Sequence, residues 1–113
     1  MSNPAIDLNE LKEIMGNDME LIQDCFSDFI DDMPQIYEEI EKAVLEKNAQ
    51  ELDASAHKLK GTLKYLAADA AANAAYDIEA AGKENKLKNL DGKLEILENE
   101  CNKVTDYINN FKF

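Results

Sequence analysis

Residues 90–111, LDGKLEILENECNKVTDYINNF, contain the clearest structural signal in the chain. Apolar residues recur there at alternating intervals of four and three positions. The series is Leu90, Leu94, Leu97, Cys101, Val104, Ile108 and Phe111. This spacing holds for three heptads and places the seven side chains on one stripe of an α-helix. The segment therefore predicts a long amphipathic helix that must bury its stripe against other helices.

A second long helix is predicted ahead of it, from Asn17 onward. Asn17 and Glu20 have the spacing of a capping box, which marks a helix start. The inward positions that follow are Ile22, Phe26, Phe29, Met33, Ile36, Ile40 and Val44. Pro34 lies inside this stripe, and because the apolar period continues beyond it, we expect a kink and not an end.

Two further helices are predicted between these two. Asn48 and Glu51 form another capping box, and the helix that follows has an apolar face. That face consists of Leu52, Ala56, Leu59, Leu63 and Leu66. A turn at residues 67–69 then leads to an alanine-rich helix that ends near Gly82. Its inward residues Ala71, Ala75 and Ile78 are mostly small, which allows close packing of helices.

A short first helix is predicted from the capping-box spacing of Asp7 and Glu10, ending near Gly16. No segment has the alternating pattern of a strand, so the fold class is all-α. An antiparallel four-helix bundle with this short additional N-terminal helix buries every apolar stripe. Without a linker or an internal repeat, residues 1–113 are expected to form a single domain.

The charge of the chain excludes several kinds of partner. Twenty-four acidic and twelve basic residues give a formal net charge of −12, which repels nucleic acid phosphates and anionic lipids. No stretch reaches the roughly 20 apolar residues of a membrane span, and residues 1–10 lack the features of a signal peptide. We expect a cytoplasmic monomer in which Cys25 and Cys101 are reduced and packed within the helix stripes.

His57, the only histidine, is the candidate for chemistry. It lies roughly 140° from the centre of its helix's apolar face, so its ring should point to solvent together with Lys60, Gly61 and Lys64. A neutral imidazole is a nucleophile, and the two lysines would offset the charge of an attached phosphoryl group. Glycine in mid-helix costs about 1 kcal/mol, which suggests a notch for a partner. A lone histidine among lysines is also common on ordinary surfaces, so these positions alone assign no function.

The stretch AHKLKGT, residues 56–62, resembles the A-H-x-L-K-G-[S/T] signature of histidine-containing phosphotransfer (HPt) domains. The likeness continues in FIDDMP at residues 29–34, which is similar to the F-L-x-D-x-P stretch of that family. Residues 66–68 resemble its L-G-A turn, and residues 78–79 resemble its L-E pair. The chain departs from the pattern at Ala67, where glycine is usual, and at Ala71, where a larger apolar residue is common.

The resemblance implies a phosphorelay intermediate. His57 would accept a phosphoryl group from the aspartyl phosphate of a receiver domain and pass it to another receiver, with Lys60 supporting the group and Gly61 clearing its path. The partners would be receiver domains of hybrid sensor histidine kinases and response regulators. Such a domain is not an enzyme and has no cofactor of its own, because Mg²⁺ belongs to the receiver. The cognate partners, the direction of transfer and the larger protein context stay open.

Two other classes of protein are alternatives to a phosphorelay intermediate. A helical interaction module without phosphate chemistry explains the acidic surface equally well, although it gives no reason for Gly61 beside the histidine. A di-iron or other metal protein needs inward Glu-x-x-His pairs, which one histidine cannot supply, so no metal site is expected. Partner docking is expected on an apolar patch formed by Leu8, Leu11, Ile14 and Ile30, on the first helix and the exposed edge of the second.

Overall fold

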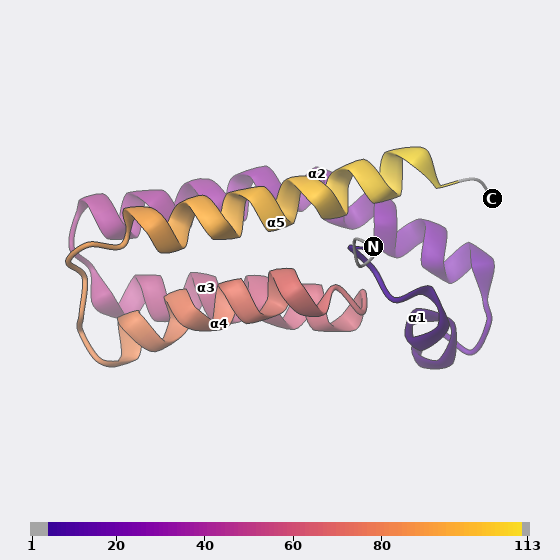
Figure 1. Ribbon diagram of the computed structural model, residues 1–113, viewed down its shortest axis with the longest axis horizontal. Helices are drawn as coiled ribbons and strands as arrows, with labels where there is room; N and C mark the ends of the chain where they lie inside the picture. Colours follow the sequence, from indigo (N-terminus) through magenta and orange to yellow (C-terminus); the bar gives the residue numbers. More distant parts are fainter. Residues whose placement is uncertain (1–4, 112–113) are drawn as a thin grey trace.

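The computed structural model describes residues 5–111, and this part of the chain is built from helices without strands. The helices are α1 (Leu8–Ile14), α2 (Met19–Leu45), α3 (Ala49–Tyr65), α4 (Asp69–Lys83) and α5 (Asp91–Asn110). Figure 1 shows that successive long helices run in opposite directions, with α2 and α5 in one layer and α3 and α4 in the other. The predicted all-α bundle with a short additional N-terminal helix is confirmed.

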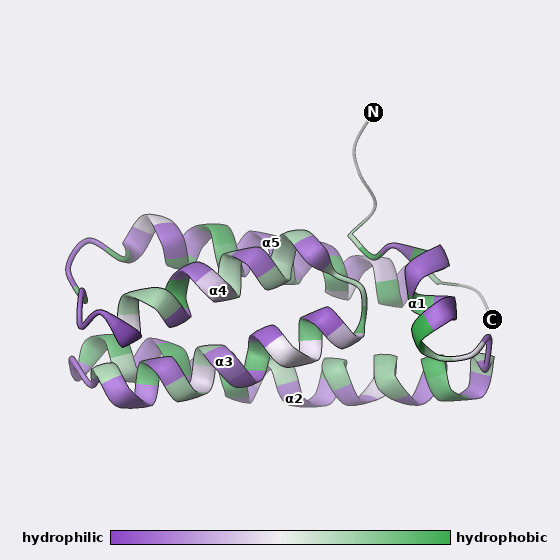
Figure 2. Ribbon diagram, turned by 90° about the horizontal axis from the view of Figure 1, so that it is seen from below, coloured by the Kyte–Doolittle hydropathy of each residue, from purple (hydrophilic) through white to green (hydrophobic). Residues whose placement is uncertain are grey.

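The long α2 sets the length of the bundle and provides the site for α1. Its 27 residues span about 40 Å, close to the 41 Å long axis of the molecule, and it continues unbroken through Pro34. It therefore extends beyond the end of α3, and α1 lies at that end of the molecule (Figures 1 and 2). Ile6, Leu11 and Met15 bury their side chains there, joining α1 to the core.

The helix starts follow the predicted capping boxes with one correction. The side chains of Asp7 and Asn48 accept hydrogen bonds from the amides of the residues three places on, as predicted. The prediction of Asn17 as the cap of α2 is wrong, because Asp18 accepts the bond from the Leu21 amide at 3.1 Å. Asn17 instead has a positive φ of 61° and closes the turn after α1, where its own amide bonds to a carbonyl of that helix.

The turn between α3 and α4 joins both helices to α1. Ala67 carries a φ of 57° there, in the left-handed region that costs an L-residue about 1–2 kcal/mol and that glycine adopts freely. This conformation explains why glycine is usual at this position in the family that the sequence resembles. The carbonyl of Ala67 accepts the Asp7 amide at 3.0 Å. In a complete capping box the Glu10 side chain would accept the hydrogen bond from the Asp7 amide, but here that amide bonds to Ala67. Only the bond from the Glu10 amide to the Asp7 side chain forms.

Close packing of α4 on α3 depends on small residues. A Cβ added to Gly82 would lie 2.7 Å from the backbone nitrogen of Asp53 and 2.9 Å from the carbonyl oxygen of Ala49. Alanines continue the contact, with Ala71 and Ala75 almost completely buried. The two backbones therefore approach closely enough for side chains of average length on α4 to reach residues on the outer edge of α3. This approach brings the candidate site together.

Candidate functional site

His57 lies in the middle of α3 with its ring in solvent. Its side chain is 68% exposed, whereas Ala56 and Leu59 on either side of it are completely buried. The prediction that the helix period turns this imidazole away from the core is confirmed. The ring is therefore accessible to a partner while its backbone is held by a packed helix.

A buried carboxylate on α4 holds one nitrogen of this ring. Glu79 is only 1% exposed, and its Oε2 lies 2.8 Å from Nδ1 of His57. An ionised carboxylate can only accept hydrogen bonds, so Nδ1 must carry the hydrogen and donate it. In the neutral ring the lone pair is then on Nε2, the nitrogen that does not face Glu79. The contact thus fixes both the orientation and the tautomer of the imidazole.

Lys60 binds the same carboxylate from the other side. Its Nζ lies 2.6 Å from Oε1 and 3.3 Å from Oε2 of Glu79, and its side chain is only 15% exposed. The ring of Tyr76 lies beside it, with its centroid 5.4 Å from the ammonium, within the range of a cation–π contact. The prediction that Lys60 stands on the exposed face beside His57 is therefore wrong, because Glu79 draws it toward α4.

Two opposing effects act on the ionisation of Glu79. Burial raises the pKa of a carboxyl group, and here it is the largest single effect. The hydrogen bonds and positive charges of Lys60 and His57 together outweigh it, so the pKa of Glu79 lies below its ordinary value of 4.5. Glu79 is accordingly a carboxylate at neutral pH, as the hydrogen bond from Nδ1 requires.

Gly61 and Lys64 occupy the exposed face as predicted. A Cβ added to Gly61 would meet nothing within 4 Å, so the space above this residue is open. This glycine is therefore not required by the packing of the bundle, in contrast to Gly82. Lys64 lies one turn beyond Gly61 and, within residues 5–111, forms no ion pair with a carboxylate.

Comparison with known proteins identifies the family. The model of the Hpt domain family matches residues 24–107, most of the chain. The chain belongs to the Hpt domain family. Hpt domains are histidine phosphotransfer intermediates of two-component signalling, and they are phosphocarriers that interact with receiver domains and kinases. The predicted family and the predicted role as a phosphorelay intermediate are confirmed at this level.

Solved structures show the same fold. The HPT domain of a hybrid sensor histidine kinase from Shewanella is 19% identical, with a TM-score of 0.80 over 93% of this chain and 91% of that one. Histidine-containing phosphotransfer protein B (HptB) from Pseudomonas aeruginosa PAO1 is 23% identical, with a TM-score of 0.78 over 96% of this chain and 94% of that one. No curated protein sequence matches this Hpt domain significantly.

Two residues of the site were missed by the sequence reasoning. In the sequence Glu79 stands out only as part of a family-like pair, and Tyr76 is not singled out by any pattern. A signal for Glu79 exists, since it follows Ala75 by four positions and precedes Gly82 by three, at the edge of the apolar stripe of α4. An acidic residue at such an edge requires a partner when the helix packs. The cation that pairs with Glu79 is Lys60 on α3, and only the packing of α3 against α4 identifies it.

The predicted docking patch is only partly exposed. Leu11 is completely buried in the core between α1 and the bundle, so its assignment to a docking surface is wrong. Leu8 and Ile30 are half-buried and pack against that core, while Ile14 is 41% exposed. The apolar residues of α1 therefore serve mainly to attach this helix to the bundle. Docking of a partner through Leu8, Ile14 and Ile30 stays a prediction.

Three findings within residues 5–111 concern metal-binding side chains, cysteines and helix hydrophobicity. Residues 5–111 contain no group of three or more metal-binding side chains of the kind that holds an ion. Both cysteines are free thiols, and burial raises the pKa of Cys101 to about 12 and also raises that of Cys25. None of the helices described between residues 5 and 111 is long and apolar enough to cross a membrane.

Glu79→Gln should destabilise this Hpt domain by about 1–3 kcal/mol at neutral pH, because the buried negative charge that accepts hydrogen bonds from His57 and Lys60 is lost. The contribution of Glu79 is complete above its unfolded-state pKa and is lost as the pH falls through its lower folded-state pKa. Thermal melts from about pH 7 to about pH 3 should show the gap in Tm between parent and variant narrowing below about pH 4.5. Asp77→Asn, an exposed acid on the same helix, is the matched control. A Tm difference between parent and variant that does not change with pH would contradict an ionised Glu79 hydrogen-bonded to His57 and Lys60.

Proposed function

We propose that Nε2 of His57 accepts a phosphoryl group from the aspartyl phosphate of one receiver domain and delivers it to the aspartate of another. The lone pair of Nε2 attacks phosphorus, the bond between phosphorus and the aspartyl oxygen breaks, and aspartate leaves as a carboxylate. Delivery is the reverse reaction with a second receiver. The observation that carries the proposal is the 2.8 Å contact between Nδ1 and the buried Glu79, made by a ring that is 68% exposed.

Glu79 has two roles in this reaction. Before transfer it holds the proton on Nδ1, which keeps Nε2 available as the nucleophile. As Nε2 bonds to phosphorus the ring becomes positively charged, and the carboxylate 2.8 Å away stabilises that charge without reorganisation. Glu79 is a positioning residue in this account, since it acts on the phosphoryl group only through the imidazole.

The lysines and Gly61 serve the phosphoryl group and its approach. Lys60 neutralises Glu79, so the site does not present an unpaired negative charge to the incoming phosphate. Lys64 supplies a further positive charge on the exposed face. Gly61 leaves open space one turn from His57, through which the acyl phosphate of a receiver can reach the ring.

The remaining parts of the proposal concern the setting of the reaction. We propose that the partners are receivers of hybrid sensor histidine kinases and response regulators, and that the Mg²⁺ of the receiver supplies the electrophilic catalysis. The domain would need no cofactor and no ATP site of its own. We further propose that residues 1–113 act as one domain, as a monomer and in the cytoplasm.

The proposal is tested by mixing the protein with a receiver domain charged by acetyl phosphate and Mg²⁺. We expect phosphate to appear on the chain in a form that mild acid removes and alkali does not, the behaviour of a phosphoramidate. A phosphate-specific gel or intact-mass measurement follows both treatments. Stable binding of the receiver without any transfer would instead support the interaction-module alternative and reject the proposal.

A further inference from the structure

Tyr76 is the only aromatic residue of α4, whose sequence DAAANAAYDIEAAGK is otherwise rich in alanine. Its side chain is 54% exposed, so the core of the bundle does not require it. Its hydroxyl takes part in none of the side-chain hydrogen bonds found within residues 5–111, whereas the hydroxyl of Tyr37 bonds to α5. The polar contact that Tyr76 does make is that of its ring with Lys60.

The ammonium of Lys60 is held between this ring and the carboxylate of Glu79. Its Nζ lies 5.4 Å from the centroid of Tyr76 and 2.6 Å from Oε1 of Glu79. Tyr76 precedes Glu79 by three positions, so both side chains project from one face of α4. The Lys60 side chain is only 15% exposed, whereas Lys64, one turn later on α3, is exposed. The two residues of α4 therefore hold an ammonium that would otherwise extend into solvent.

An aromatic ring at position 76 can do what an aliphatic side chain cannot. The face of the ring attracts a cation, and this attraction strengthens as water is excluded from the contact. Lysine has a flexible four-carbon stem and loses rotamer entropy when its ammonium is fixed, so an ion pair alone holds it weakly. The ring of Tyr76 therefore opposes the release of Lys60 from Glu79.

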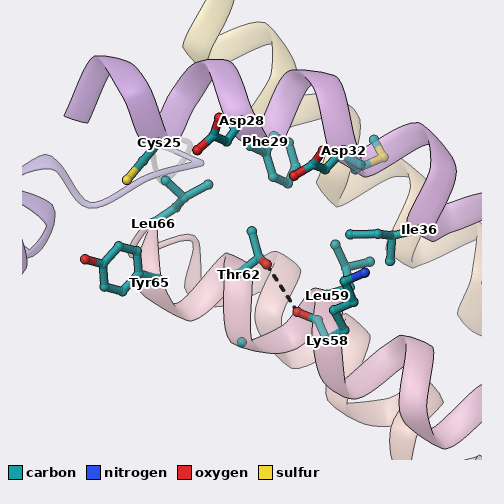
Figure 3. Close-up of a pocket in the computed structure, with 12 residues that line it drawn as sticks. Cys25, Asp28, Phe29, Asp32, Ile36, Lys58, Leu59, Thr62, Tyr65 and Leu66 are labelled. Carbon is teal, nitrogen blue, oxygen red and sulfur yellow. Dashed lines mark hydrogen bonds between the residues drawn. The ribbon is translucent and has the colours of Figure 1, made fainter. Parts of the chain in front are cut away.

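The contact lies on the α4 side of α3, outside the groove that α3 forms with α2 (Figure 3). Leu59, Gly61 and Thr62 line that groove, but Lys60 and Tyr76 do not. An effect of Tyr76 on phosphoryl transfer would therefore act through Lys60 and Glu79 and not through occupancy of the groove.

On the basis of the proposed function, we infer that Tyr76 is a positioning residue of the phosphotransfer site. Its ring keeps the Lys60 ammonium on Glu79, and this pairing sets the charge that the carboxylate presents to the imidazole of His57. With Lys60 held in place, Glu79 fixes the proton on Nδ1 while its own charge is compensated. When Lys60 is released, the carboxylate is left partly uncompensated and repels the incoming phosphate.

The experiment compares Tyr76→Leu and Tyr76→Phe with the parent. Leucine keeps an apolar side chain but has no ring, and phenylalanine keeps the ring but has no hydroxyl. With a receiver charged by acetyl phosphate and Mg²⁺, we expect the first-order transfer step at saturating receiver to fall about fivefold in Tyr76→Leu. Tyr76→Phe should stay within about twofold of the parent, because its ring also binds cations. Rapid-quench kinetics measure this step.

A second measurement follows Glu79 in the free protein by NMR titration of its ¹³C-labelled carboxyl group. Lys60 and His57 hold the pKa of Glu79 below 4.5 in the parent. Weaker pairing with Lys60 should raise this pKa toward 4.5 in Tyr76→Leu, and the ring of Tyr76→Phe should keep it low. A ring that only covers the surface of α4 would leave the titration unchanged.

The matched control is Asn73→Leu, which places the same leucine at an exposed position one turn earlier on α4. It should transfer and titrate like the parent. The inference is overturned if Tyr76→Leu keeps the parental transfer rate or the parental Glu79 titration, or if Asn73→Leu slows transfer equally. It is also overturned if Tyr76→Phe is as slow as Tyr76→Leu, because the hydroxyl and not the ring would then act. Failure of every receiver to phosphorylate the parent would instead overturn the proposed function, and the role of Tyr76 in transfer with it.

Discussion

His57→Gln is expected to abolish phosphoryl transfer to the chain. The sequence contains no second imidazole, and glutamine has no lone pair of comparable nucleophilicity at its amide nitrogen. The fold should persist, because the ring is 68% exposed and contributes to the bundle only through its contact with Glu79. We expect a loss of about 1 kcal/mol or less in the free energy of unfolding, the typical net value of one hydrogen bond.

The measurement is intact mass and a phosphate-specific gel after incubation with the charged receiver. Ala54→Gln, an exposed substitution one turn earlier on α3, is the matched control and should accept phosphate like the parent. Acid-labile phosphate on the His57→Gln protein, at any level comparable to the parent, would show that another side chain is the acceptor.

Gly61→Gln should give the second largest effect, a slowing of transfer on the order of a hundredfold, the cost of misplacing reacting groups by about 1 Å. The added side chain fills the open space through which the receiver's aspartyl phosphate approaches His57. The free protein should melt no lower than the parent, since nothing lies within 4 Å of the new Cβ and glutamine is a better helix former than glycine. Stopped-flow transfer kinetics and thermal melts measure the two effects separately.

Alanine variants provide the structural contrast for this prediction. Gly61→Ala should stabilise the helix by up to about 1 kcal/mol. Gly82→Ala should destabilise the protein by about 1–3 kcal/mol or more, because its methyl group would lie 2.7 Å from the Asp53 backbone nitrogen. If Gly61→Gln unfolds the protein, or if it transfers at the parental rate, the glycine is not there to admit a receiver.

The helices and the exposed histidine could be predicted from the sequence because both depend on local periodicity. The stripe from Leu90 to Ile108 and the position of His57 opposite Leu59 follow from 3.6 residues per turn and from burial of apolar side chains. These rules act within one helix. They hold here because every long helix of the described range is amphipathic and packs with its apolar face inward.

The features that could not be predicted depend on contacts between helices. The position of Lys60 is set by Glu79, 19 residues later, and the burial of Leu11 by the end of the bundle that α1 covers. Neither contact can be inferred from the residue spacing within the helix that carries Lys60 or within the helix that carries Leu11. The cap of α2 was misplaced by one residue, since Asn17 and Asp18 are both good caps and the φ of 61° at Asn17 is set by the turn after α1.

The most direct test of the central claim is to determine which atom carries the phosphoryl group. NMR of the protein labelled with ¹⁵N-histidine, recorded before and after phosphorylation by a receiver, distinguishes the two ring nitrogens of His57. The account predicts a proton on Nδ1 in both states, held by Glu79 at 2.8 Å, and phosphorus bonded to Nε2. Phosphorus on Nδ1, or an unmodified His57 ring in the phosphorylated protein, would contradict it.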